Sequence, residues 1–422
     1  MNLNKNYLLK GATIIDVENE TAFRGAIEVD QGIIKNIFWQ DSVLPKDIET
    51  IMVEGKYIIP GLVDMHCHIK EDFAPQFVAS GVTTVRNTAG NVLQLKKLIE
   101  SRMDAPTPRV YSADRMIDGP PGLWGPTGVA NLVTDDPLVS KVEVIRQKNA
   151  GAKFIKIYGL ISKEVMEAVV TEAGDYGFEV SCDLIHASQV NALDAAKAGV
   201  KWFEHASGFI QVLYPNWNPS ADQVEWDKIN WNQPDKEKIQ ELCIEMLKYD
   251  VKICPTLVIF DQINLWPNYW CPENIVTKTF EGASSLKNLW ETMGNNYENE
   301  LKKQLGTQLQ FVKAIAKTYA DLGGTVVTGT DTPGGVWTIP GMALHRELEL
   351  FVEMGFTEME ALQSATIKAA NSIKLNDIGS IKEGKIADMV ILNKNPLENI
   401  QHTQDIDKVI KGGVHLFTKG DS

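Results

Sequence analysis

Apolar and polar positions divide the chain into two β-rich ends and a long middle. From 7 to 57, short β-type runs alternate with turn residues, and similar runs return at 386–392 and 409–414. This spacing is typical of a small antiparallel sheet. We therefore expect one discontinuous domain, β-sandwich-like and built from both termini, over residues 1–60 and 370–422.

The middle of the chain repeats a pattern of strand, loop and helix. Helical periodicity appears at 163–173, 188–198 and 308–322, between apolar runs of strand length. Those runs lie at 61–66, 83–86, 109–112, 154–158, 179–185, 202–205, 252–256 and 325–330. Parallel strands joined by helices in this number predict an α/β fold, a (β/α)8 TIM-like barrel over residues 61–369.

Composition narrows the class of protein. The chain has 422 residues, with 41 Lys+Arg against 55 Asp+Glu and a net charge of −14, so neither nucleic acid nor an anionic membrane is expected as a partner. Its five cysteines have no paired spacing, which favours a reducing compartment. No apolar leader opens the sequence and no stretch approaches the ~20 apolar residues of a membrane span, so we expect a cytoplasmic protein.

The strongest candidate for chemistry is the pair His66 and His68 at the end of a buried apolar run. Side chains alternate along a strand, so residues i and i+2 project from the same face. Two imidazoles so placed make half of a transition-metal site. The same alternation predicts that Cys67 points away from the metal and packs in the core.

Other polar residues follow the later strands. Lys156 interrupts an apolar strand, and the isoleucines on either side of it share the opposite face, so its ammonium group is expected inside the barrel. His186, His205 and Asp331 end the fifth, sixth and eighth predicted strands. Barrel enzymes carry their chemistry at these carboxyl ends. Each residue taken singly also has a structural explanation, but the set together predicts a metal site.

A buried lysine without a partner loses its proton readily, and a neutral amine can take up carbon dioxide to become a carbamate. Carbamylated Lys156 would bridge two divalent cations, with zinc the first choice and manganese, iron or cobalt alternatives. The expected ligands are His66, His68 and Asp331 on one metal and His186 and His205 on the other. Asp331 is also expected to move a proton, and Tyr158 to hydrogen-bond a developing oxyanion.

These residues lie in motifs that resemble the amidohydrolase superfamily, in the branch of imidazolonepropionase-like and Xaa-Pro dipeptidase-like proteins. The matching segments are 60–68 (PGLVDMHCH), 154–157 (FIKI), 203–206 (FEHA), 329–331 (GTD) and 379–388 (GSIKEGKIAD). The resemblance implies a distorted barrel, one or two divalent metals, a homo-oligomer and hydrolysis of amide or amine bonds. Two departures border the expected pocket: Arg86-Asn87 stands where that branch usually has Arg-Asp, and the segment 158–162 replaces a small glycine-rich loop.

The leading hypothesis is therefore a metal-dependent hydrolase in which metal-activated hydroxide attacks a C–N bond of a small amide-type molecule. An N-acyl amino acid, a Xaa-Pro-like dipeptide, a lactam or a carbamate fits this chemistry. A mononuclear aminohydrolase that deaminates a heterocyclic amine is the alternative, although such relatives usually lack the strand-four lysine. A non-catalytic scaffold is the third hypothesis, and the complete set of expected ligands argues against it.

Aromatic residues near the mouth of the barrel have two interpretations. Six of the ten tryptophans fall in residues 206–290: Trp217, Trp226, Trp231, Trp266, Trp270 and Trp290. They predict either a lid over an apolar substrate or packing on the barrel or across a dimer. Trp124 is a candidate substrate wall. Arg346 is expected either to meet a substrate carboxylate or to pair with Glu349 or Glu353.

Overall fold

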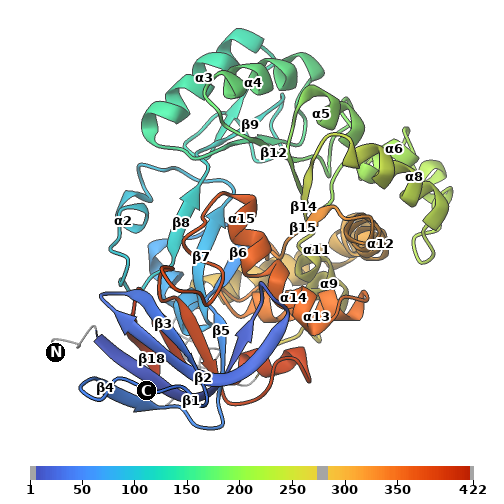
Figure 1. Ribbon diagram of the computed structural model, residues 1–422. Helices are drawn as coiled ribbons and strands as arrows, with labels where there is room; N and C mark the ends of the chain where they lie inside the picture. The colour runs from blue at the N-terminus through green and yellow to red at the C-terminus, as the bar shows by residue number, and fades with distance from the viewer. Residues whose placement is uncertain (1–5, 273–283, 419–422) are drawn as a thin grey trace.

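The computed structural model describes residues 6–272 and 284–418. Strands from both ends of the chain form one sheet, in the order β18-β17-β16-β5-β1-β2-β3 with β4 also paired to β1 (Figure 1). The N-terminal strands are β1 (Asn6–Asp16), β2 (Thr21–Asp30), β3 (Ile33–Trp39), β4 (Glu49–Met52) and β5 (Tyr57–Pro60). The C-terminal strands are β16 (Met389–Leu392), β17 (Ile406–Lys411) and β18 (Val414–Thr418). The two segments meet where β5 and β16 pair antiparallel, with Ile58 opposite Ile391.

The prediction of an antiparallel sheet is wrong for two of these pairs. Both β4 and β5 run parallel to β1, with Tyr7 opposite Glu49 and Thr13 opposite Tyr57. After β3 the chain crosses back, so that β4 and β5 start from the same end as β1. They occupy successive halves of its free edge, on either side of a bulge between Lys10 and Thr13. The terminal sheet is therefore mixed.

The middle of the chain forms the predicted barrel. Its strands are β6 (Leu62–Cys67), β7 (Val82–Asn87), β8 (Arg109–Ser112), β9 (Met116–Asp118), β10 (Asn131–Val133), β11 (Ile155–Tyr158), β12 (Val180–Asp183), β13 (Trp202–Glu204), β14 (Lys252–Cys254) and β15 (Thr325–Val326). They pair in a parallel sheet β6-β7-β8 and a parallel sheet β10-β9-β11-β12-β13-β14-β15. Every residue of β6 and β7 is buried, as expected for strands covered on both faces.

Backbone hydrogen bonds join the two parallel sheets. The Lys153 N–H donates to Ser112 O over 2.8 Å, next to β8. On the other side the Asp331 N–H donates to His66 O over 2.7 Å, and Cys67 bridges Thr332. Strand β15 is shorter than the predicted 325–330 because its continuation bonds to β6 in this irregular way.

Helices cover the outside of the barrel. Figure 1 shows α3 (Pro137–Ala150) and α4 (Lys163–Asp175) side by side, next to β9 and β12. The other α-helices are α1 (Ala74–Ala79), α2 (Lys96–Ile99), α5 (Ala192–Ala198), α6 (Phe209–Leu213), α7 (Gln223–Asp227), α8 (Lys236–Leu247), α9 (Leu257–Leu265), α11 (Ser284–Gln304), α12 (Leu309–Asp321), α13 (Ala343–Glu353), α14 (Glu358–Ser364) and α15 (Ile367–Ser372). The helix expected from 188 begins at 192, because the Asn191 side chain accepts from the Asp194 N–H and caps it.

The chain leaves the terminal sheet at Pro60 and enters the barrel at Leu62, and between them the Gly61 N–H donates to Asp388 O. The expected second boundary, at 369/370, falls inside α15, a helix that contacts β6 and β15. The division into domains stays a prediction. In the described part of the chain, no helix combines the length and the apolar character that crossing a bilayer requires.

Candidate metal centre

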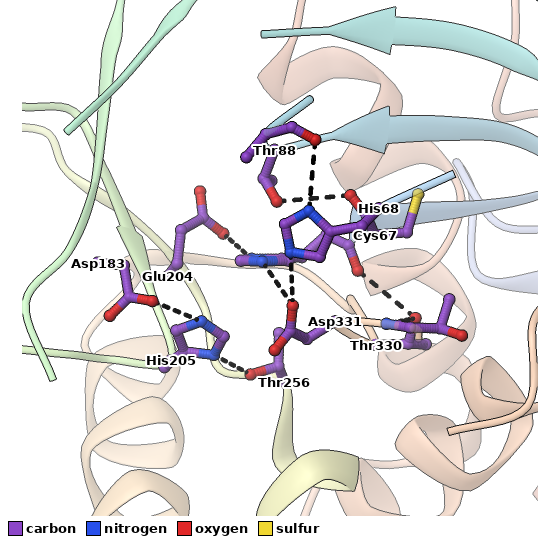
Figure 2. A network of polar contacts seen from close by, with 12 residues as sticks. Cys67, His68, Thr88, Asp183, Glu204, His205, Thr256, Thr330 and Asp331 are labelled. Atoms are coloured by element: carbon purple, nitrogen blue, oxygen red, sulfur yellow. Dashed lines mark hydrogen bonds and ion pairs between the residues drawn. The ribbon is translucent and has the colours of Figure 1, made fainter. Parts of the chain in front are cut away.

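The site begins at the carboxyl end of β6. His66 is buried and the His68 side chain is 34% exposed, with their ring centroids 5.5 Å apart. Cys67 lies between them and belongs to the apolar core, and Figure 2 shows its sulfur pointing away from Asp331. The alternation expected from the sequence therefore places both imidazoles on one face.

Asp331 faces both histidines. Its Oδ1 lies 3.2 Å from His66 Nε2 and 2.9 Å from His68 Nε2. The residue has a φ of 53°, which is strained for a non-glycine residue and is held by its backbone bond to His66 O. Burial raises the pKa of Asp331, but the two imidazoles more than offset this and hold it well below the ordinary value. One ligand atom from each of the three residues fits within a 4.8 Å cluster, so the set can hold a divalent cation.

Two buried carboxyl groups support His66. Glu204 Oε2 accepts from His66 Nδ1 over 2.7 Å, and its Oε1 accepts from Arg86 over 2.7 Å and from the Ser181 hydroxyl over 2.5 Å. Burial raises the pKa of Glu204, but the charges of Arg86 and His66 hold it well below the ordinary value. Asp64 accepts from Thr330 Oγ1 over 2.6 Å, and burial raises its pKa to about 7. The sequence analysis did not single out either carboxyl group, although Glu204 stands in the segment 203–206.

Lys156 lies inside the barrel. Only 2% of it is exposed, and its Nζ has no hydrogen-bond partner among the described residues. Its neighbours Ile155 and Ile157 belong to the apolar core, as the alternation requires. The positive charge of Lys156 contributes to lowering the pKa of Asp183. A buried amino group without a hydrogen-bond partner is a candidate for the carbamate expected from the sequence.

His205 extends the cluster across the barrel. Its ring centroid lies 4.7 Å from that of His66. Its Nδ1 is 2.5 Å from Thr256 Oγ1, and its Nε2 is 3.2 Å from Asp183 Oδ2 (Figure 2). Burial raises the pKa of Asp183, but His205 and Lys156 lower it to about 2. Asp183 is a third carboxylate, after Glu204 and Asp64, that was not singled out from the sequence.

His186 does not join the other predicted ligands. Strand β12 ends at Asp183, and the chain then turns, with the Ile185 N–H donating to Asp183 Oδ1. Counting the strand to residue 185 was wrong, because this turn ends the alternation three residues before His186. Within the described ranges, no hydrogen bond or ion pair connects His186 to another predicted ligand. Burial lowers its pKa, against the opposing charges of Asp183 and Asp118.

Tyr158 ends β11 beside the carboxylates of the site. Burial and the charge of Asp183 raise its pKa well above the ordinary value, and the Trp124 indole hydrogen-bonds its hydroxyl. Trp124 is 65% exposed and stands on a loop anchored by Asp118, whose carboxylate accepts from backbone N–H groups. With the indole donating to the phenol oxygen, the Tyr158 O–H can donate elsewhere.

The tryptophans of 206–290 divide into two groups. Trp217, Trp226 and Trp231 have centroids 4.9–5.3 Å apart, and Trp231 also contacts Phe311 of α12, so packing explains them. A second group contains Trp266, Tyr269, Trp270, Trp290, Trp337 and neighbouring apolar side chains. It adjoins the site, because Trp290 Nε1 donates to Pro333 O, two residues past Asp331. Arg346 pairs with Glu349 and Glu353, as the plainer interpretation expected, and also with Asp261.

The fold and the site define a barrel protein with a cluster of histidines and carboxylates able to hold divalent metal at its strand ends. A profile described as the amidohydrolase family matches residues 309–416. An imidazolonepropionase of Geobacillus sp. (strain WCH70) is 36% identical over 399 residues, covering 89% of this chain and 84% of that protein. The chain therefore belongs to the amidohydrolase family.

Two further relatives agree with this assignment. The ochratoxinase of Aspergillus niger is 26% identical over 331 residues, which is 73% of this chain but only 55% of the length of that relative. The crystal structure of a Xaa-Pro dipeptidase with bound methionine superposes with a TM-score of 0.69 at 22% identity, covering 98% of this chain and all of the other. That structure shows the shared fold, a TIM-like barrel with a β-sandwich-like domain.

Proposed function

We propose that the protein is a metal-dependent amidohydrolase that cleaves the C–N bond of a small amide-type molecule. The observation that carries this is the placement of Asp331 Oδ1 within 3.2 Å of His66 Nε2 and 2.9 Å of His68 Nε2. A carboxylate that meets two imidazoles in this way is a common arrangement around a divalent cation. Family membership supports the same chemistry.

The residues that would hold metal fall into two halves. His66, His68 and Asp331 form the first half, and His205 with Lys156 contributes to the second. Lys156 would bridge them as a carbamate, formed when its neutral amine adds carbon dioxide and releases a proton. The partnerless Nζ supports this modification. Zinc suits the nitrogen and oxygen donors, and so do manganese, iron and cobalt.

A divalent cation supplies a Lewis acid that polarises the amide carbonyl and makes water easier to deprotonate. Asp331 accepts the proton of the attacking water and returns it to the leaving nitrogen. The Tyr158 hydroxyl donates a hydrogen bond to the carbonyl oxygen as negative charge develops there. The Trp124 indole lies within hydrogen-bonding reach of the phenol oxygen, so the phenol proton stays available to a substrate.

The substrate class follows from the relatives and the aromatic residues near the site. The relatives are named for ochratoxin, a Xaa-Pro dipeptide and imidazolonepropionate. The second aromatic group packs next to the segment that carries Asp331, because Trp290 donates to Pro333 O. N-acyl amino acids and Xaa-Pro-like dipeptides with an apolar or ring-containing side chain are therefore the first substrates to test, before lactams and carbamates.

We also propose a cellular location, a type of partner and an oligomeric state for the protein. A cytoplasmic location is supported by the four buried cysteines, Cys67, Cys182, Cys243 and Cys254, which form no disulfide, because a reducing compartment keeps thiols in this state. A small molecule is the expected partner, rather than nucleic acid or membrane. Assembly into a homo-oligomer rests on the resemblance alone.

The test combines metal content with hydrolysis. Protein purified without chelator should carry two metal equivalents per chain and hydrolyse members of an N-acyl amino acid and dipeptide panel. Chelation should abolish hydrolysis, and zinc or manganese should restore it. The Lys156→Ala variant should bind about one equivalent and lose nearly all activity, because the bridging ligand is gone.

Three outcomes would count against parts of this proposal. If the wild-type protein contained no metal, the proposal of a metal-dependent hydrolase would be wrong. One equivalent together with release of ammonia from heterocyclic amines would favour the mononuclear deaminase. Two equivalents retained by Lys156→Ala would eliminate the carbamate bridge and leave the hydrolase in place.

A further inference from the structure

The three histidines of the site each have one ring nitrogen occupied by a fixed partner. His66 Nδ1 faces Glu204 over 2.7 Å, and His68 Nδ1 faces Ala89 O over 3.4 Å. His205 Nδ1 lies 2.5 Å from Thr256 Oγ1, whose own proton goes to Pro255 O over 2.8 Å. In all three, Nδ1 faces an oxygen atom, which leaves Nε2 as the ring nitrogen available to a metal.

Each of these Nε2 atoms faces a carboxylate oxygen. His66 and His68 face Asp331, and His205 faces Asp183 at 3.2 Å. A carboxylate oxygen beside an imidazole Nε2 at the mouth of the barrel gives two donor atoms that one divalent cation can share. For Asp331 that cation is the metal of the proposed function. Asp183 stands in the same relation to His205.

We propose that Asp183, and not His186, is the metal ligand that β12 contributes, completing the second half of the site with His205 and Lys156. The inference rests on the proposed function, since it assigns a ligand within that site. Asp183 Oδ1 accepts from the Ile185 N–H, which turns Oδ2 toward His205. The β11–β12 register puts Asp183 opposite Tyr158 and Ser181 opposite Lys156, so Asp183 lies at the mouth of the barrel.

This assignment changes the chemistry of the second half of the site. With Asp183 and a Lys156 carbamate, one imidazole is joined by oxygen donors, whereas His66, His68 and Asp331 offer two imidazoles. Oxygen-rich sites suit harder cations such as manganese, and imidazole-rich sites suit zinc. The second half should therefore exchange its metal more easily and accept manganese more readily than the first.

The experiment compares matched variants of the full chain by elemental analysis after reconstitution with zinc or with manganese. Asp183→Asn should lose about one metal equivalent, because an amide is a poor ligand, while His186→Asn should keep the wild-type content. Asp183→His should keep two equivalents and shift the preference of the second half toward zinc by tenfold or more. Circular dichroism and thermal melts show which variants fold. If Asp183→Asn does not fold, the comparison with wild type is made with Asp183→His.

The assignment of Asp183 would be wrong if Asp183→Asn kept the wild-type content of both metals. It would also be wrong if His186→Asn lost one equivalent. Neither result would contradict the proposed hydrolase function. An unchanged zinc preference in Asp183→His would also overturn the assignment. If the wild-type protein binds no metal after reconstitution, the proposed function fails and the assignment fails with it.

Discussion

Glu204 shows at the scale of one residue how a charge is kept inside the barrel. The side chain is fully buried, and Arg86, which it pairs with, is stacked between the rings of Phe154 and Trp202 at 4.1 and 4.2 Å. An ionised pair in the interior is costly unless further hydrogen bonds and contacts stabilise the two charged groups. The Glu204 carboxylate has two further hydrogen-bond partners, the Ser181 hydroxyl and His66 Nδ1. The pair therefore orients a metal ligand, while Nε and Nη2 of Arg86 have no hydrogen-bond partner among the described residues and lie between the two rings.

Replacing this carboxylate should weaken metal binding and the fold together. In Glu204→Gln the amide cannot neutralise Arg86, and it no longer fixes the proton on His66 Nδ1. Loss of such a supporting partner costs about 10- to 100-fold in metal affinity. Leaving the buried Arg86 charge unpaired costs about 3–5 kcal/mol of unfolding free energy. Competition with a chromogenic chelator and urea denaturation measure the two effects.

Glu179→Gln is the matched control, because Glu179 pairs with Lys252 and Trp202 without contacting the histidines. Its metal affinity should equal that of the wild type. If Glu204→Gln keeps its affinity within twofold of wild type, Glu204 does not orient His66.

At the scale of elements, the sequence predicted eight of the barrel strands but missed the short β9 and β10, and it did not predict where each strand ends. His66, His68, Lys156 and Asp331 were placed together because each lies in or directly after an apolar run. The predicted end of the fifth strand was wrong because β12 ends in a turn closed by a side chain, although apolar residues continue past it to Ile185. The role of His186 as a ligand stays a prediction. The supporting role of Glu204 depends on partners from other strands, which periodicity does not reveal.

Helix α3 owes part of its position to one carboxylate. Glu143 accepts from Arg115 over 2.7 and 2.6 Å, and from Arg146 and Gln147 of its own helix. Burial raises the pKa of Glu143, but these bonds lower it to about 2 from an ordinary value of 4.5. Because the folded-state pKa is depressed, the carboxylate stabilises the fold above pH 4.5, and this contribution is lost as the pH falls through that range.

Between pH 5 and 3, the wild type should therefore lose about 1–2 kcal/mol more unfolding free energy than Glu143→Gln. Urea denaturation at several pH values measures the difference. Glu172→Gln on the neighbouring α4 is the control, and its pH dependence should follow that of the wild type. Parallel curves for wild type and Glu143→Gln would show that the network contributes nothing to stability.

At the scale of the whole molecule, the two ends of the chain stabilise one sheet. The core of this sheet contains Ile14 and Ile58 from the first segment and Ile391 and Ile410 from the last. Ile391 is fully buried opposite Ile58. The expectation of one domain from both termini came from two β-rich ends, and the sheet joins them. The parallel direction of β4 and β5 could not be predicted from the sequence, because it depends on the crossover that the chain makes after β3.

Truncating this core should lower stability without touching the metal site. Ile391→Ala removes a buried side chain and leaves a cavity, which costs about 2–5 kcal/mol of unfolding free energy. Metal content per folded chain should stay at the wild-type value. Denaturation and elemental analysis on the same sample measure the unfolding free energy and the metal content. Lys394→Ala is the control, because the Lys394 side chain is 61% exposed. A loss of metal in folded Ile391→Ala would show that the terminal sheet positions the site.

The pairing of β5 with β16 also sets an order of events on the ribosome. Tyr57 leaves the exit tunnel early, whereas its partner Leu392 emerges only after the whole barrel has been translated. Throughout that interval the outer edge of β5 has unpaired backbone groups, which neighbouring nascent chains can pair with. Translation that stalls before residue 389 leaves this edge open, so the sheet can be completed only after β16 has been translated.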